Sequence, residues 1–159
     1  RPPRSTIFPY TTLFRSDLKG DIACVLGAFM IAKKSLLDEL AGFDEDFFLY
    51  GEDQDLAWRI RKKGYIIGYI EKAEVFHWGS QSEIKTAPPA LFRKKLQAEF
   101  LFYQKHYSPS TIERIKASQT RKALFRLYTL NMQLLFTRDT EKLRDKIECY
   151  RIVLETCRT

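Results

Sequence analysis

Residues 42–60 limit the fold of this chain more than any other stretch. They hold six carboxylates within twelve positions, interleaved with aromatic side chains: Asp44, Glu45, Asp46, Glu52, Asp53 and Asp55. Burying six ionised carboxylates together would be too costly, because each would lose its hydration. Some of these side chains must therefore be exposed, be paired with cations or serve a functional site.

The second half of this stretch predicts a helix over residues 52–63. Gly64 follows as a typical helix stop, and Asp55 lies one turn before Arg59, the spacing of an i,i+4 ion pair. One face of the predicted helix is apolar and consists of Leu56, Ala57 and Ile60.

Asp53 has no partner at that spacing and shares the apolar face. Its carboxylate is therefore expected to point inward from the first helical turn, where the helix N-terminus favours negative charge. An inward carboxylate in a cleft suits a general base. The alternative is that Glu52 and Asp53 only decorate the end of a helix.

The remainder of the first eighty residues predicts an α/β layer. Residues 22–31 form an apolar run, which predicts a buried strand, and Gly27 within it suggests the close approach of another group. A short helix is expected over 34–40, and two short strands over 65–70 and 73–77.

After residue 79 the pattern becomes helical. One predicted amphipathic helix has its apolar residues three and four positions apart: Phe92, Leu96, Phe100, Tyr103 and Tyr107. Ser110 and Glu113 have the spacing of a capping box that would open the next helix. Asp139 is placed to cap a last helix, whose inward side chains would be Leu143, Ile147, Tyr150 and Leu154.

Residues 1–16 show neither the period of a strand nor that of a helix. They resemble the conceptual translation of a sequencing adapter at every position except Ile7, and are expected to be a non-native scar. The alternative is a natural proline-rich arm. Residues 17–159 would then be a gene fragment cut at its 5′ end.

Composition narrows the function classes. No uncharged apolar run approaches the ~20 residues that span a bilayer. Cys24, Cys149 and Cys157 lack metal-ligand or paired spacing, which favours free thiols of a cytosolic protein. Residues 17–80 carry 8 Lys and Arg against 12 Asp and Glu, whereas residues 81–159 carry 16 against 8. This division suggests a carboxylate-bearing site beside a surface that attracts anions.

These motifs, in this order, resemble the C-terminal half of a bacterial family-2 glycosyltransferase of the rhamnosyltransferase-like branch. The resemblance covers residues 22–82 and extends weakly through 102–107. It rests on four motifs: Gly27-Ala28-Phe29-Met30-Ile31, Gly42-Phe43-Asp44-Glu45-x-Phe47-Phe48-x-Tyr50-x-Glu52-Asp53-x-Asp55-Leu56-x-x-Arg59, Gly64-Tyr65 and His77-x-Gly79-x-x-Ser82. It implies the C-terminal, acceptor-side half of a GT-A domain over 17–82, followed by a helical, basic extension over 83–159.

The resemblance also implies roles for individual residues. Asp53 would be the general base that deprotonates the acceptor hydroxyl, and Glu52 would help to shape the acceptor site. His77 would complete the coordination of a divalent cation, Mg²⁺ or Mn²⁺, that neutralises the nucleotide diphosphate. A lone histidine at a strand end is more commonly structural, and that alternative remains. The candidate acceptor-binding residues are Phe47, Tyr50, Asp55 and Trp78, with packing as the alternative for the aromatic residues at 47–50.

The family's nucleotide-binding strands and its Asp-x-Asp metal motif are not found in these 159 residues. Asp44-Glu45-Asp46 is similar in composition, but it lies inside the acceptor-loop motif and is not assigned to metal. Residues 17–159 alone are therefore expected to bind nucleotide sugar poorly and to show no turnover.

The expected activity is the inverting transfer of a sugar from a nucleotide-diphosphate donor to a polysaccharide or lipid-linked glycan. The resemblance favours rhamnose from a dTDP donor. The basic side chains of the tail would form a solvated face or attract an anionic membrane: Lys94, Lys95, Arg121, Lys122, Arg126 and Arg144. No motif supports a nucleic-acid partner. The expected location is cytoplasmic, at the inner face of the plasma membrane.

Two other classes remain open. One is a non-catalytic binding or scaffold protein built on a degenerate GT-A half. The other is a membrane-surface adaptor in which only the basic helices act.

Overall fold

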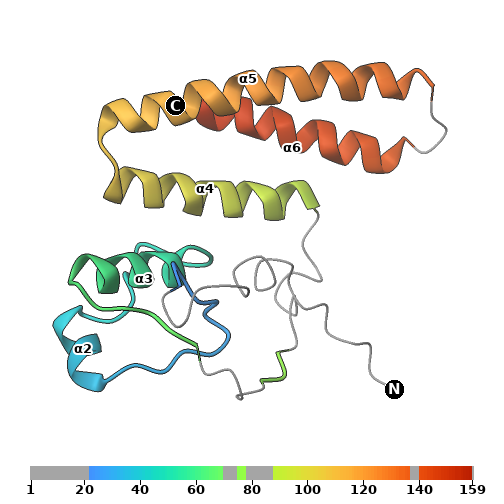
Figure 1. Ribbon diagram of the computed structural model, residues 1–159. Coiled ribbons are helices and arrows are strands. Elements are labelled where there is room, and N and C mark those ends of the chain that lie inside the picture. Colours follow the sequence, from blue (N-terminus) through green and yellow to red (C-terminus); the bar gives the residue numbers. More distant parts are fainter. Residues whose placement is uncertain (1–21, 70–74, 78–87, 137–139, 159) are drawn as a thin grey trace. The chain divides into compact units, whose positions relative to one another are not determined.

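A computed structural model describes residues 22–69, 75–77, 88–136 and 140–158 of the chain (Figure 1). The chain divides into two compact units, residues 1–84 and 85–159.

Two helices supply the regular structure in the described part of the first unit. Helix α2 spans Lys34–Glu39 and helix α3 spans Glu52–Lys62. Left-handed glycines follow both helices, Gly42 with φ +68° and Gly64 with φ +87°. Glycine adopts this backbone without a Cβ penalty, which is why it ends helices. Both predicted helices and both predicted stops are confirmed.

The predicted strands are wrong for the residues that the structure describes. Segments 22–31, 65–69 and 75–77 contain no regular strand, and the rest of the two later predictions lies outside the described residues. The first two segments meet at one point, where the Ile22 N–H donates to the Ile67 carbonyl over 2.7 Å. A strand needs such bonds along its length, and a turn at Gly27 interrupts the first segment. The regular structure of the described residues is therefore entirely helical, not α/β.

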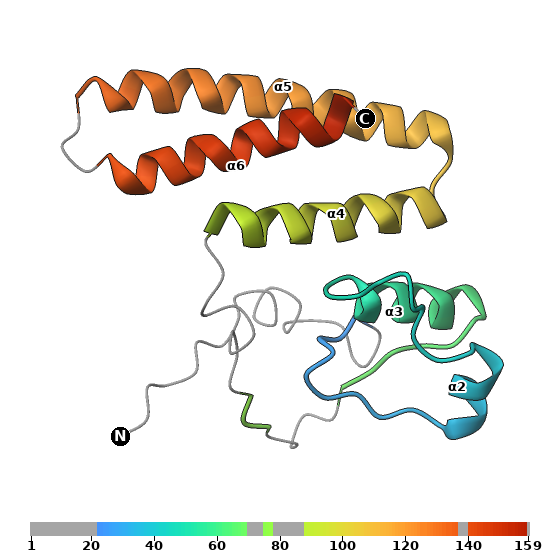
Figure 2. The same cartoon turned by 180° about the vertical axis from the view of Figure 1, so that it is seen from behind.

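The second unit is built from three helices, α4 over Pro88–His106, α5 over Pro109–Leu134 and α6 over Glu141–Arg158. Both α4 and α5 pack against α6, and α5 runs antiparallel to each of the other two (Figures 1 and 2). One cluster of buried residues in this unit consists of Leu96, Phe100, Ala123, Ile152 and Val153. Within the described part of the chain, no helix is both long and apolar enough to cross a bilayer.

The start of α5 differs from its predicted capping box. The N-cap is Ser108, whose Oγ accepts the Thr111 N–H over 3.3 Å, and Ser110 already lies inside the helix. Pro109 takes the first helical position because its fixed φ suits that position and its missing N–H is not needed there. The predicted cap at Asp139 lies outside the described residues.

The last helix buries the predicted face together with two further side chains. Ile147 is buried, and Leu143, Tyr150 and Leu154 are half-buried. Ile152 and Val153, which the periodicity did not single out, are buried as well. An ion pair between Arg93 on α4 and Glu155 on α6, with 2.9 Å between nitrogen and oxygen, links the ends of these two helices.

Candidate functional site

Arg59 fixes the loop between α2 and α3. Its Nε donates to Asp55 Oδ2 over 2.7 Å, which confirms the predicted i,i+4 pair. Its two terminal nitrogens donate to the Leu40 carbonyl over 2.8 Å and the Gly42 carbonyl over 2.9 Å. One guanidinium therefore satisfies a carboxylate and two carbonyls that follow α2, and ties the loop to α3.

Asp55 is the most deeply buried charged side chain among the described residues, at 1% exposure. The Arg59 side chain is 22% exposed. A carboxylate withdrawn from solvent and held by a guanidinium is poorly placed to contact an acceptor sugar. Its surroundings suit positioning of the loop better than the acceptor-binding role that the resemblance implied.

Asp53 lies in the first turn of α3 and is half-buried. Its Oδ2 accepts the Gly27 N–H over 2.9 Å, and its Oδ1 accepts the Gln54 N–H over 2.8 Å. The helical face predicted an inward orientation, and the structure directs the carboxylate to the 22–31 segment. It thereby brings together two motifs that are 26 positions apart in the sequence.

The close approach expected at Gly27 is made by the Asp53 side chain. A Cβ added at Gly27 would lie 3.5 Å from the Asp53 Cβ and 3.7 Å from its Oδ2. These are ordinary van der Waals distances. A Cβ would therefore fit at this position, and the contribution of Gly27 to the site is its N–H donor.

The negative charge of the Asp53 carboxylate acts on the thiol of Cys24. Burial and, as the second cause, the negative charge of Asp53 raise the pKa of the Cys24 thiol to about 11. The thiol therefore stays protonated at neutral pH and is a weak nucleophile.

Glu52 presents a buried acceptor beside Asp53. Its Oε2 has no hydrogen-bond partner among the residues that the structure describes. A buried oxygen of this kind is costly unless a donor completes it.

The aromatic residues of the loop divide between core and surface. Phe47 is 7% exposed and packs inside, whereas Phe48 is 96% exposed. Tyr50 is half-buried and has φ +70°, followed by Gly51 with φ +84°. A left-handed residue with a side chain costs roughly 1–2 kcal/mol, so the loop enters α3 under strain immediately before Glu52. Trp78 lies outside the described residues.

Phe48 lies in the aromatic stretch 47–50 but was not among the predicted acceptor-binding residues. It offers an exposed ring in the acceptor-loop motif, where Phe47 offers none.

His77 is described and exposed. Across segments 22–69, 75–77, 88–136 and 140–158, no three His, Cys, Asp or Glu side chains come together as a group that could hold a metal ion. These donors therefore do not fit a Mg²⁺ or Mn²⁺ site by themselves. The metal role of His77 stays a prediction.

Comparison with known families decides what the chain is. Residues 11–138 match the family described as glycosyl transferase family group 2. The chain belongs to this family. The predicted resemblance is therefore confirmed, and the matched region of this family 2 domain extends beyond residues 22–82 on both sides. Members of this family transfer a sugar from a donor to an acceptor and are typically metal-dependent.

The family 2 domain is also similar to individual proteins. It is 32% identical over 78 residues to an N-acetylglucosaminyl-diphospho-decaprenol L-rhamnosyltransferase of Mycobacterium tuberculosis, in strain CDC 1551 / Oshkosh and equally in strain ATCC 25618 / H37Rv. The aligned part is 46% of this chain and 25% of each relative. The chain thus spans about a quarter of the length of the relatives it matches. No solved structure matches it.

Proposed function

We propose that this family 2 domain forms the acceptor side of an inverting glycosyltransferase, with Asp53 as the general base. The observation that supports this most directly is the orientation of the Asp53 carboxylate by two backbone N–H groups. A carboxylate has about four lone-pair sites, and two are used here. The remaining sites can accept the proton of an acceptor hydroxyl.

In the proposed reaction, the acceptor hydroxyl oxygen attacks the anomeric carbon of the donor sugar while its proton passes to Asp53. The bond between the anomeric carbon and the diphosphate breaks, and its electron pair leaves with the nucleoside diphosphate. A single displacement inverts the anomeric centre and needs no nucleophilic side chain.

The proposed donor is a nucleoside-diphosphate sugar, with rhamnose supported by the names of the matched relatives. Those names also support an acceptor glycan linked through diphosphate to a polyprenol. A divalent cation would neutralise the diphosphate of the donor, and His77 is the described residue proposed to contribute to its coordination. Phe48 is proposed to contact the acceptor because its ring is exposed, and Glu52, which precedes Asp53 in α3, is proposed to help shape the acceptor site.

The experiment uses the longest open reading frame that contains residues 17–159 in the source DNA. The encoded protein is incubated with dTDP-rhamnose and a diphospholipid-linked N-acetylglucosamine, and the new linkage is analysed by NMR. The proposal predicts a product whose anomeric configuration is inverted relative to the donor. Retention of configuration would contradict it, because retention requires a different arrangement of groups. The 159-residue chain alone should show no turnover.

A further inference from the structure

Helix α5 has a second apolar face that nothing covers among the described residues. Ala123 and Leu130 are buried against the rest of the helical unit. Six other large apolar side chains, 42% to 84% exposed, lie along the same helix and the turn that follows it. This α5 apolar face consists of Leu124, Phe125, Tyr128, Met132, Leu135 and Phe136.

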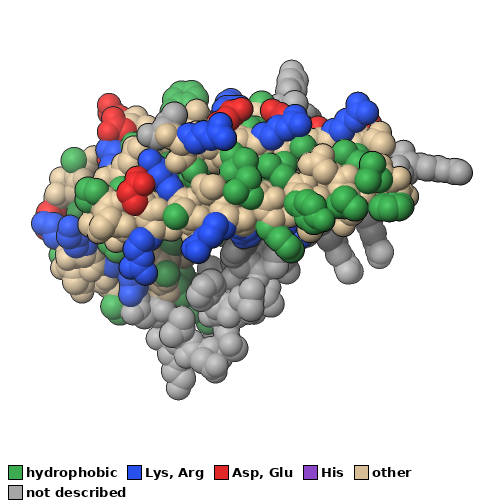
Figure 3. All heavy atoms as spheres, turned by 90° about the horizontal axis from the view of Figure 1, so that it is seen from above, with side chains coloured by type: hydrophobic (Ala, Val, Ile, Leu, Met, Phe, Trp, Pro, Cys, Tyr) green, Lys and Arg blue, Asp and Glu red, His purple; other side chains and the backbone are tan. Residues whose placement is uncertain are grey.

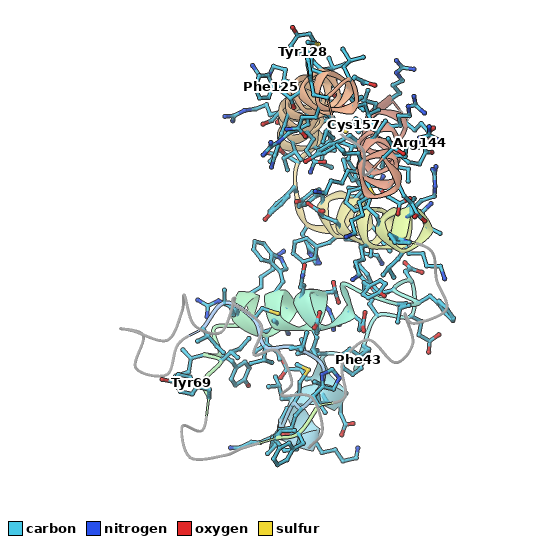
Figure 4. The ribbon with its side chains drawn as sticks, turned by 90° about the vertical axis from the view of Figure 1, so that its right-hand side faces the viewer. Phe43, Tyr69, Phe125, Tyr128, Arg144 and Cys157 are labelled. Atoms are coloured by element: carbon cyan, nitrogen blue, oxygen red, sulfur yellow. The ribbon has the colours of Figure 1, made fainter. Side chains whose placement is uncertain are left out.

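The spacing places these residues on one stripe. From Phe125 the stripe advances by three to Tyr128 and by four to Met132, so the side chains align along one side of a helix. Figure 4 shows Phe125 and Tyr128 projecting away from the packed helices. Seen from above, apolar side chains gather on the surface of the helical unit beside Lys and Arg side chains (Figure 3).

The charges next to the stripe have one sign. Residues 117–136 contain Arg121, Lys122 and Arg126 and no acidic residue. All three cations are exposed. Lys122 and Arg126 are one turn apart, so they follow one flank of the stripe. The surface thus combines a row of exposed rings and aliphatic chains with a cationic margin.

We propose that the α5 apolar face docks on an anionic lipid bilayer, with α5 lying in the plane of the interface. Apolar side chains would enter the boundary between headgroups and acyl chains, and the cations would contact phosphate groups. A second copy of the chain fits the surface less well, because a two-fold contact through this face would bring like charges together. This inference goes beyond the transfer reaction and does not depend on it.

The test is co-sedimentation of the 159-residue chain with vesicles of phosphatidylglycerol and phosphatidylcholine. The chain should bind these vesicles, bind pure phosphatidylcholine weakly, and bind less as NaCl rises from about 50 mM to about 500 mM. The triple variant Phe125→Gln/Tyr128→Gln/Phe136→Gln should lose at least about tenfold in affinity at every salt concentration. The variant Arg121→Gln/Lys122→Gln/Arg126→Gln should lose at least about tenfold at low salt only.

Two control variants test whether vesicle binding depends on this face, and not on any exposed aromatic ring or on positive charge elsewhere in the chain. Phe76→Gln removes an exposed ring outside the helical unit, at a side chain that is 89% exposed, and should bind as the unchanged chain does. Lys94→Gln/Lys95→Gln/Arg144→Gln removes the same charge away from α5 and should lose less than about threefold.

Three results would overturn the proposal. One is unchanged vesicle binding by the apolar variant. Another is equal loss in the two charge variants. The third is sedimentation velocity that shows a dimer for the unchanged chain and a monomer for the apolar variant, since the face would then bind a second copy. Because all three substituted apolar side chains are exposed, circular dichroism of the triple variant should show unchanged helix content. If the helix content falls, the single variant Phe125→Gln replaces the triple variant in the vesicle assay.

Discussion

The Gly27 N–H donates to Asp53 Oδ2 over 2.9 Å and thereby joins an irregular segment to the first turn of α3. A backbone donor orients the carboxylate and leaves lone pairs on both oxygens. The arrangement therefore combines a fixed direction with the capacity to accept a proton. The proposed function depends on this relationship more than on any other contact.

Removing the partner of Arg59 should unfold the loop side of the first unit. Asp55→Ala leaves a largely buried guanidinium without its carboxylate and is expected to cost about 3 kcal/mol in the free energy of unfolding. Asp38→Ala is the matched control, because Lys34 and Asp38 form an i,i+4 pair at the same 2.7 Å but with side chains 86% and 61% exposed. Its cost should be below about 0.5 kcal/mol. Urea unfolding of the 159-residue chain measures both, and equal costs would contradict a structural role for Asp55.

Glu52→Gln should change the acceptor KM without lowering the free energy of unfolding. The substitution removes a carboxylate whose buried Oε2 lacks a donor, so the free energy of unfolding should stay unchanged or rise by up to about 1 kcal/mol. In the longer reading frame, acceptor KM should rise about tenfold, because a side chain that shapes the proposed acceptor site is altered. A loss of stability beyond about 1 kcal/mol would instead assign Glu52 to the fold.

The thiol of Cys24 should report the charge on Asp53. In a Cys149→Ser/Cys157→Ser background, alkylation by iodoacetamide should accelerate about tenfold per pH unit from about pH 8 to about pH 10, since the pKa lies at about 11. Asp53→Asn removes one cause of the raised pKa, so alkylation at about pH 9 should become several-fold faster. A rate that levels off near pH 9 would show that the thiol is neither buried nor near the carboxylate.

The raised pKa of Cys24 also sets a direction for stability. Folding favours the protonated thiol, so its contribution to the free energy of unfolding is complete below the ordinary thiol pKa of 9.0. It is lost as the pH rises from there toward about 11. Cys24→Ser should therefore flatten the decline in stability over this range in urea titrations.

Substitutions in the buried core and on the α5 apolar face should differ in their cost to the free energy of unfolding. Ile152→Ala creates a cavity at a side chain that is 2% exposed and should cost about 3 kcal/mol. Phe125→Ala removes a larger side chain that is 65% exposed and should cost less than about 0.5 kcal/mol. Comparable costs in urea unfolding would mean that the α5 apolar face is covered.

Local patterns predicted the helices well because a helix closes its hydrogen bonds within itself. The residue types in 52–63 and the glycine at position 64 were sufficient to place α3. The strands failed for the opposite reason. An apolar run such as 22–31 becomes a strand only if another segment pairs with it along its length, and the described residues provide one bond, to Ile67.

The sequence predicted properties of single residues in the candidate site but not which residues contact each other. The helical face indicated that Asp53 points inward, and Gly27 indicated that some group approaches it. Their mutual contact spans 26 positions, and no spacing rule reaches that far. Phe47 and Asp55 were chosen by motif alone, and burial now favours Phe48 at the surface and a positioning role for Asp55.

The most direct test of the account is sugar transfer by the longest reading frame containing this chain, compared with its Asp53→Asn and Asp46→Asn variants. Asparagine keeps the size of Asp53 and an oxygen for the Gly27 N–H but cannot take up the proton. The account predicts that Asp53→Asn lowers kcat by about 10²- to 10⁴-fold, while Asp46→Asn, an exposed carboxylate of the same motif, changes it less than about threefold. Transfer by Asp53→Asn at the unchanged rate would contradict the general-base assignment and favour a non-catalytic role for this part of the protein.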